Sequence, residues 1–221
     1  MILINWVQVL PYVLLYLLNQ WFVHVFNIEL STFYPFKPKE ANILFLGQDM
    51  IYKQSVILSL SDLRQSISRN EMSSNTTRAP YLTSWVSCIG KIKFNFYDLG
   101  SHWIAGRVWR DYSAKMDAVV YIVNANTKTM EQFSGPREEL NALLSDEAFA
   151  NVPFLIFCIT VEPSSCPEEE LCSLLNLTNT TGKGRVDLAV ANARPLEVFV
   201  VESYNKKQYL DGFKWLSKYI K

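Results

Sequence analysis

Four nearly continuous apolar runs constrain the fold of this chain more than any other feature of its sequence. Strands buried on both faces of a parallel sheet have this composition, whereas strands with one solvated face alternate apolar and polar residues. Apolar residues at helical spacing lie between or after the runs, so the sequence predicts a doubly wound α/β fold, with a mostly parallel sheet and helices on both faces. The runs are residues 42–46, 118–123, 152–159 and 196–201.

The segments between these runs also have readable patterns. Residues 85–89 and 91–97 alternate like the strands of a β-hairpin, with Gly90 and Lys91 at the turn. The polar, turn-rich stretch 65–80 is expected to be a loop. Helices are predicted over residues 53–63, 136–144 and 209–220. Because ligands of doubly wound sheets bind at the carboxyl ends of the strands, the residues just after each run are the candidate site.

The first 28 residues contain no Asp, Glu, Lys or Arg. They lack the basic start and the small-residue cleavage site of a signal peptide. The segment is long enough for a spanning helix, but polar residues and a proline interrupt it. Its tryptophans, tyrosines and phenylalanines favour the headgroup boundary. The segment is therefore predicted to be an apolar membrane helix, and lying on the bilayer is slightly favoured over spanning it.

The rest of the chain is predicted to be a linker, residues 29–41, followed by one domain, residues 42–221. Lys and Arg together number 21, as do Asp and Glu, so no basic field indicates nucleic acid binding. The four cysteines form no CxxC pair and only two histidines are present. No structural metal site is predicted, and the cysteines are expected to be free thiols.

The first predicted strand leads directly into the run GQDMIYKQS. In a phosphate-binding loop, G-x-x-x-x-G-K-[ST], backbone N–H groups and the lysine hold phosphates and the hydroxyl binds Mg²⁺. Gly47 and Lys53 have this spacing, but Tyr52 replaces the second glycine and Gln54 replaces the hydroxyl residue. Ser55 lies one residue late. On its own the match is weak, and an ordinary strand–loop–helix is the better interpretation of it.

Several longer strings resemble the Sar-type (secretion-associated, Ras-related) small GTPases of the Ras-like/ADP-ribosylation-factor group. Residues 98–102, DLGSH, resemble the DLGGH of that family, and residues 107–112 follow at the family's distance. The order and spacing of the strings hold from about residue 42 to residue 221. The other matching strings are residues 146–153, 180–184, 192–199 and 212–215.

The resemblance implies a P-loop small-GTPase fold and a role in COPII vesicle budding, which carries proteins from the endoplasmic reticulum to the Golgi. It implies GTP, GDP and Mg²⁺ as ligands. It also implies the COPII coat and exchange and activating proteins as partners. The expected location is the cytosolic face of the endoplasmic reticulum membrane, with the Golgi as a second location and attachment through residues 1–28.

The resemblance also assigns roles position by position. Asp98 falls on the acidic residue that serves Mg²⁺, Gln54 falls on the Mg²⁺ hydroxyl, and His102 falls on the catalytic, water-orienting histidine. The first-switch threonine falls near Ala79, with Thr77 and Thr83 as substitutes. The positions expected to contact nucleotide are Gly47, Asp49, Lys53, Gln54, Ser55, Gly100, Ser101 and Glu162.

The guanine-reading motif N-K-x-D falls on residues 159–162, ITVE. The bracing asparagine and the lysine are therefore lost, and a longer carboxylate replaces the aspartate. The last base-contacting element falls near residues 202–204, where Glu202 would repel the base carbonyl.

Three hypotheses follow. The favoured one is a pseudo-GTPase interaction module whose nucleotide binding is weakened or lost. The second is a divergent, active GTPase in which Ser55 and Glu162 take displaced roles, so enzymatic activity is left open. The third, weaker one is binding of another nucleotide or anion.

Overall fold

The computed structural model describes most of the predicted domain. The predicted membrane segment 1–28, the loop 65–80 and four expected site residues, Gly100, Ser101, His102 and Glu162, lie outside the described residues. Within the described part of the chain, no helix is long and apolar enough to cross a membrane. The described residues are 39–61, 83–99, 109–110, 112–126, 129–161, 167–177, 179–184 and 194–220.

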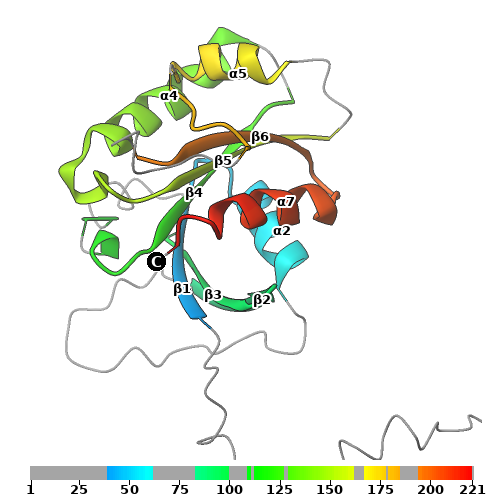
Figure 1. Ribbon diagram of the computed structural model, residues 1–221. Coiled ribbons are helices and arrows are strands. Elements are labelled where there is room, and N and C mark those ends of the chain that lie inside the picture. Colours follow the sequence, from blue (N-terminus) through cyan, green and yellow to red (C-terminus); the bar gives the residue numbers. More distant parts are fainter. Residues whose placement is uncertain are drawn as a thin grey trace, which may run out of the picture. The chain divides into compact units, whose positions relative to one another are not determined.

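Six strands form one sheet in the order β2-β3-β1-β4-β5-β6 (Figure 1). All neighbouring strands are parallel except β2 and β3, which form an antiparallel hairpin with Gly90 and Lys91 at its turn. The mostly parallel sheet and the hairpin are therefore confirmed. The strands are β1 (Lys39–Leu46), β2 (Thr83–Ile89), β3 (Ile92–Asp98), β4 (Ala118–Asn124), β5 (Phe154–Thr160) and β6 (Leu196–Glu202).

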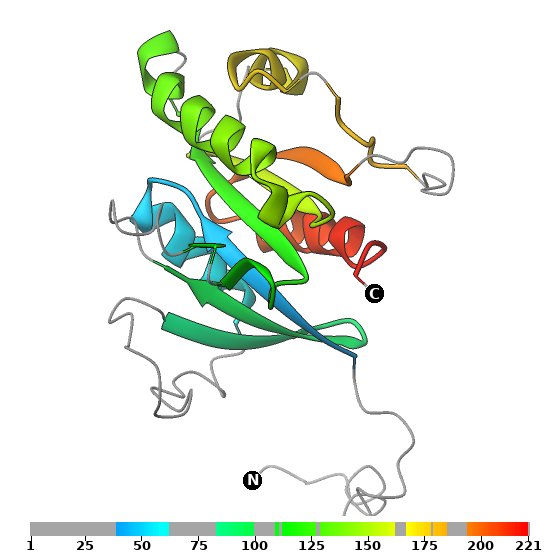
Figure 2. The same ribbon diagram turned by 90° about the vertical axis from the view of Figure 1, so that its left-hand side faces the viewer.

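Helices cover both faces of this sheet, as the apolar runs predict (Figure 2). On one face, α2 (Met50–Leu60) and α7 (Lys206–Leu216) pack against the strands. On the other face lie α4 (Met130–Ser145) and α5 (Glu168–Leu174). A short 3₁₀ helix, η2 (Glu147–Phe149), follows α4.

The element boundaries differ from the sequence predictions in several places. Strand β1 begins at Lys39, inside the stretch predicted to be a linker. Helix α4 begins at Met130, so Pro136 lies inside the helix and not at its start. Helix α5 was not predicted, and α7 begins at Lys206, three residues before the expected start. Helix α2 also begins three residues early, at Met50, because Asp49 caps it.

Two of the strings that resemble the Sar family, 146–153 and 192–199, are tied together by Arg194. Its guanidinium donates to Leu144 O at 2.6 Å and to Phe149 O at 3.1 Å, and it lies 5.3 Å from the centroid of the Phe154 ring. The bonds satisfy carbonyl groups at the ends of α4 and η2, which have no partner inside a helix. Since Phe154 begins β5, these contacts lie at the amino end of the strands.

Candidate functional site

The carboxyl ends of β1, β3, β4, β5 and β6 lie along one edge of the sheet, where ligands of doubly wound folds bind. Of the predicted site residues, the structure describes Gly47, Asp49, Lys53, Gln54, Ser55 and Asp98, and all six follow or end β1 and β3. Thr83, one substitute for the first-switch threonine, begins β2 and is the register partner of Asp98.

Gly47 makes the turn out of β1. Its φ is +124°, and a Cβ at this position would lie 2.3 Å from Ile122 O on β4. Real Cβ atoms essentially never approach a carbonyl oxygen so closely, and a positive φ of this size is strained for every other residue. The backbone conformation and the close approach to β4 are therefore enough to require glycine at position 47, whether or not the loop binds phosphate.

Asp49 starts helix α2 by capping it with its own carboxylate. Its Oδ1 accepts hydrogen bonds from Ile51 N and Tyr52 N, each at 3.1 Å, and its backbone oxygen accepts from Lys53 N at 3.1 Å. Aspartate is a favoured N-cap because it satisfies N–H groups that have no partner inside the helix. In a phosphate loop the same N–H groups hold the anion. Here the N–H groups of residues 51, 52 and 53 are bonded to the protein itself.

Lys53 and Asp98 form a buried ion pair at the ends of β1 and β3. The Lys53 side chain is fully buried, and its Nζ lies 2.8 Å from Asp98 Oδ1. The side chain of Asp98 is only 4% exposed. The two residues expected to serve the phosphates and Mg²⁺ thus neutralise each other, in surroundings where the separated charges are costly.

Gln54 and Ser55 follow in the first turns of α2. Gln54 is exposed, and Ser55 is half-buried. The Ser55 hydroxyl donates to Ser203 O at 3.3 Å, in the turn after β6. The Tyr209 hydroxyl, whose pKa burial raises to about 12, donates to the same oxygen at 3.0 Å. Ser55 is thereby directed toward the predicted base-contacting turn.

Two asparagines at the carboxyl end of β4, within the edge predicted to bind a ligand, link the strand ends. Asn124 is the last residue of β4 and Asn126 lies two residues later. Asn126 Nδ2 donates to Tyr52 Oη at 2.5 Å and to Asn124 Oδ1 at 2.9 Å. Asn126 Oδ1 accepts from Val161 N at 2.6 Å, and Asn124 Nδ2 donates to Asp49 Oδ2 at 3.2 Å. The chain of bonds joins the start of α2 to the ends of β4 and β5. Their place at the end of an apolar run predicts that they lie at the site, but no motif in the sequence assigns a role to either of them.

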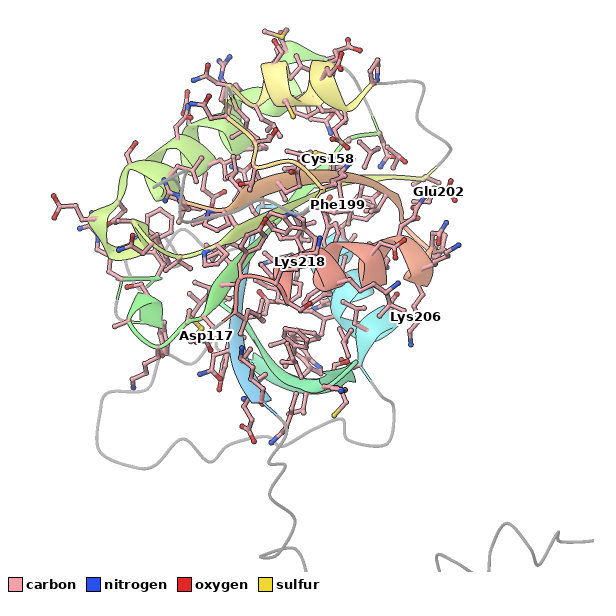
Figure 3. The ribbon with its side chains drawn as sticks, in the orientation of Figure 1. Asp117, Cys158, Phe199, Glu202, Lys206 and Lys218 are labelled. Carbon is pink, nitrogen blue, oxygen red and sulfur yellow. The ribbon has the colours of Figure 1, made fainter. Side chains whose placement is uncertain are left out.

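The predicted guanine-reading positions at the end of β5 have changed character. Ile159 and Thr160 are buried, while Val161 is 54% exposed. Within the described residues, Thr160 Oγ1 has no hydrogen-bond partner. Glu202 is the last residue of β6 and Lys206 is the first residue of α7 (Figure 3). Ile159 therefore replaces the asparagine of the motif, and Thr160, with its short hydroxyl side chain, replaces the lysine. Val161 occupies the position at which the motif accepts any residue.

A small pocket of about 210 Å³ lies beside the start of α2. Small-molecule sites usually measure ~300–1,000 Å³, so this pocket is smaller than the usual small-molecule site. The side chain of Gln48 lies against Gly135, where an added Cβ would lie 2.9 Å from Gln48 Nε2. The residues that line the pocket are Gln48, Asp49, Ile122, Asn124, Gln132 and Pro136.

Comparison with known proteins agrees with this architecture. The model of the ADP-ribosylation factor family matches residues 29–220. The small COPII coat GTPase SAR1 of Nicotiana tabacum is 39% identical over 193 residues, which cover 83% of this chain and 91% of that protein. The SAR1 of Giardia intestinalis is 33% identical over 186 residues, covering 82% and 91%.

A solved structure shows the same fold. The Arl6 BBS3 small GTPase of Trypanosoma brucei, determined with the bound nucleotide analogue GppNp, aligns with a TM-score of 0.59 at 18% identity. The alignment covers 81% of this chain and 96% of that one. The sheet order, the loop after β1 and this likeness define a domain of the small-GTPase class. The chain belongs to the ADP-ribosylation factor family, as a Sar-type member.

Proposed function

We propose that this protein works in COPII-dependent transport, at the cytosolic face of the endoplasmic reticulum membrane, as an interaction module whose nucleotide binding is weakened or lost. The trafficking role is supported by the SAR1 relatives, which are named as small COPII coat GTPases and match most of this chain. Coat and regulatory proteins are the proposed partners, and residues 1–28 are the proposed membrane attachment, since they carry no charged side chain.

The bonding of the phosphate loop to itself carries the proposal of weakened nucleotide binding. Relatives in this family bind GTP or GDP with Mg²⁺. In this chain the groups that would hold the phosphates and Mg²⁺ are bonded to other protein groups, so they do not fit that ligand. The N–H groups of Ile51 and Tyr52 are bonded to Asp49, and Lys53 is paired with Asp98. A phosphate group would have to displace the Asp49 carboxylate and separate a buried ion pair.

Divergent GTPase activity is the second candidate, and one observation favours it. Lys53 and Asp98 lie together at the sheet edge, at the positions that the family uses for the phosphates and Mg²⁺. A bound nucleotide with Mg²⁺ would supply each of them with a replacement partner of opposite charge.

Recruitment of the coat to membranes tests the proposed function. The full-length chain is bound to liposomes, purified COPII inner coat is added, and the coat that floats with the liposomes is measured with GTP, with GDP and with EDTA. We expect the same recovery in all three conditions, and the same recovery with the variant Lys53→Ala. Recovery that requires GTP, and that Lys53→Ala abolishes, would support the active GTPase. No recovery in any condition would contradict the interaction module itself.

A further inference from the structure

Asn126 connects two elements that a nucleotide would otherwise connect. Its amide group contacts Tyr52 on helix α2 and the backbone of Val161 after β5, at 2.5 and 2.6 Å. The phosphate loop lies at the start of α2, and the guanine-reading positions lie at the end of β5. A nucleotide in the family's position would therefore span the same two points, and this three-residue link lies between them.

The link also stands in for a side chain that this sequence lacks. By resemblance, the asparagine of the guanine-reading motif braces the pocket, but Ile159 occupies that position and is fully buried among apolar residues. Its side chain has no hydrogen-bonding group. Asn126 supplies both a donor and an acceptor at the neighbouring strand end, and Tyr52, which replaces the loop's second glycine, supplies the oxygen that receives the donor.

We propose that Asn126, acting through Tyr52, is a positioning residue that holds this edge of the sheet together and keeps nucleotide out. The inference rests on the proposed function and explains how the site is closed. The Tyr52–Asn126–Val161 link fixes the start of α2 against the end of β5 through side chains and backbone of the protein itself. A nucleotide gains access only when the Tyr52–Asn126 bond is broken. The same bond therefore stabilises the folded domain and opposes nucleotide binding.

A double-mutant cycle on the full-length chain in mild detergent tests the link. The variants are Tyr52→Phe, Asn126→Ala and both together, and the readout is the midpoint of thermal unfolding. We expect each single variant to lower the midpoint by about 2–4 °C, as the loss of one hydrogen bond does in a domain of this size. The double variant should fall no further than Asn126→Ala alone. Additive losses would overturn the proposal.

Tyr204→Phe is the matched control, because Tyr204 lies at the same edge and is 86% exposed. Its effect should be small and should add to that of Asn126→Ala. Coupling of equal size between Tyr204→Phe and Asn126→Ala would show that the cycle reports general loosening of the edge, and would contradict a specific link.

Affinity for GDP with Mg²⁺, measured by calorimetry, separates exclusion from a merely structural role. Tyr52→Phe and Asn126→Ala should bind GDP about tenfold more tightly than the unchanged protein, which corresponds to about 1.4 kcal/mol. Unchanged or weaker binding in the variants, or none at several millimolar GDP, would overturn the exclusion. Tight binding by the unchanged protein would refute the proposed function instead, while the unfolding cycle would still decide whether the link exists.

Discussion

Lys53 Nζ lies 2.8 Å from Asp98 Oδ1, and both side chains are buried. Substituting Lys53→Met should lower the free energy of unfolding by about 3–5 kcal/mol, because the Asp98 carboxylate would lose the cation that offsets its burial. The double variant Lys53→Met/Asp98→Leu should lose less than this, since it leaves no unpaired charge. Urea unfolding measures both.

The exposed pair between Lys214 and Asp211 provides a control for this cycle. These side chains are 70% and 47% exposed, so Lys214→Met should cost less than about 1 kcal/mol. A Lys53→Met variant no less stable than Lys214→Met would show that the buried pair does not stabilise the domain.

Gly47 should tolerate no side chain. Gly47→Ala should lower the free energy of unfolding by at least about 2 kcal/mol, because the new Cβ would meet Ile122 O and the φ of +124° is strained. Gly90→Ala is the matched variant, since Gly90 also has a positive φ, +64°, but its Cβ would meet nothing within 4 Å. It should cost about 1 kcal/mol. Equal losses would argue against the close approach of the loop to β4.

Glu197 on β6 should make stability depend on pH. The residue is buried, its Oε2 has no hydrogen-bond partner among the described residues, and burial raises the pKa of its carboxyl above the ordinary 4.5. Between pH 4.5 and the raised pKa, the folded protein therefore holds a proton that the unfolded chain releases. The resulting stabilisation is fully present below pH 4.5 and is lost as the pH rises through the raised pKa.

Glu197→Gln isolates this contribution. The amide cannot ionise, so the variant should be more stable than the unchanged protein at neutral pH, and its free energy of unfolding should vary less between pH 4 and pH 8. Urea unfolding across this range measures the difference. Parallel pH profiles for the two proteins would assign the dependence to other groups.

Arg194 should matter for stability although it lies away from the candidate site. Arg194→Leu removes two donors from the carbonyl oxygens of Leu144 and Phe149, and should cost about 1–3 kcal/mol in chemical unfolding. Arg110→Leu loses an ion pair in which the arginine side chain is 69% exposed, and should cost under about 1 kcal/mol. The reverse order would contradict the structural role given to Arg194.

The sheet could be predicted from the sequence because burial on both faces leaves unbroken apolar runs, as in β4 and β5. The start of α2 could not, since the run after Gly47 was compared with a phosphate loop, whereas Asp49 caps its own helix. The proline in α4 misplaced that helix for a similar reason, because proline is frequent at the first helical position. In both cases the local sequence was compatible with two possible helix starts, and the tertiary contacts of the folded domain determined which one forms.

The site was predictable in position but not in bonding. The ends of the apolar runs located the edge, and the spacing of Gly47 and Lys53 identified the loop. The pairing of Lys53 with Asp98 and of Tyr52 with Asn126 joins residues 45 and 74 positions apart. Such contacts depend on how the strand ends meet, which no local pattern in the sequence reports.

Calorimetric titration of the full-length protein with GTP and with GDP, in Mg²⁺ and mild detergent, tests the central claim most directly. The self-bonded phosphate loop predicts no saturable binding up to about millimolar nucleotide, which corresponds to less than about 4 kcal/mol of binding free energy. Micromolar or tighter binding that prefers guanine over adenine nucleotides, and that Lys53→Ala abolishes, would contradict the account and establish a nucleotide-binding switch.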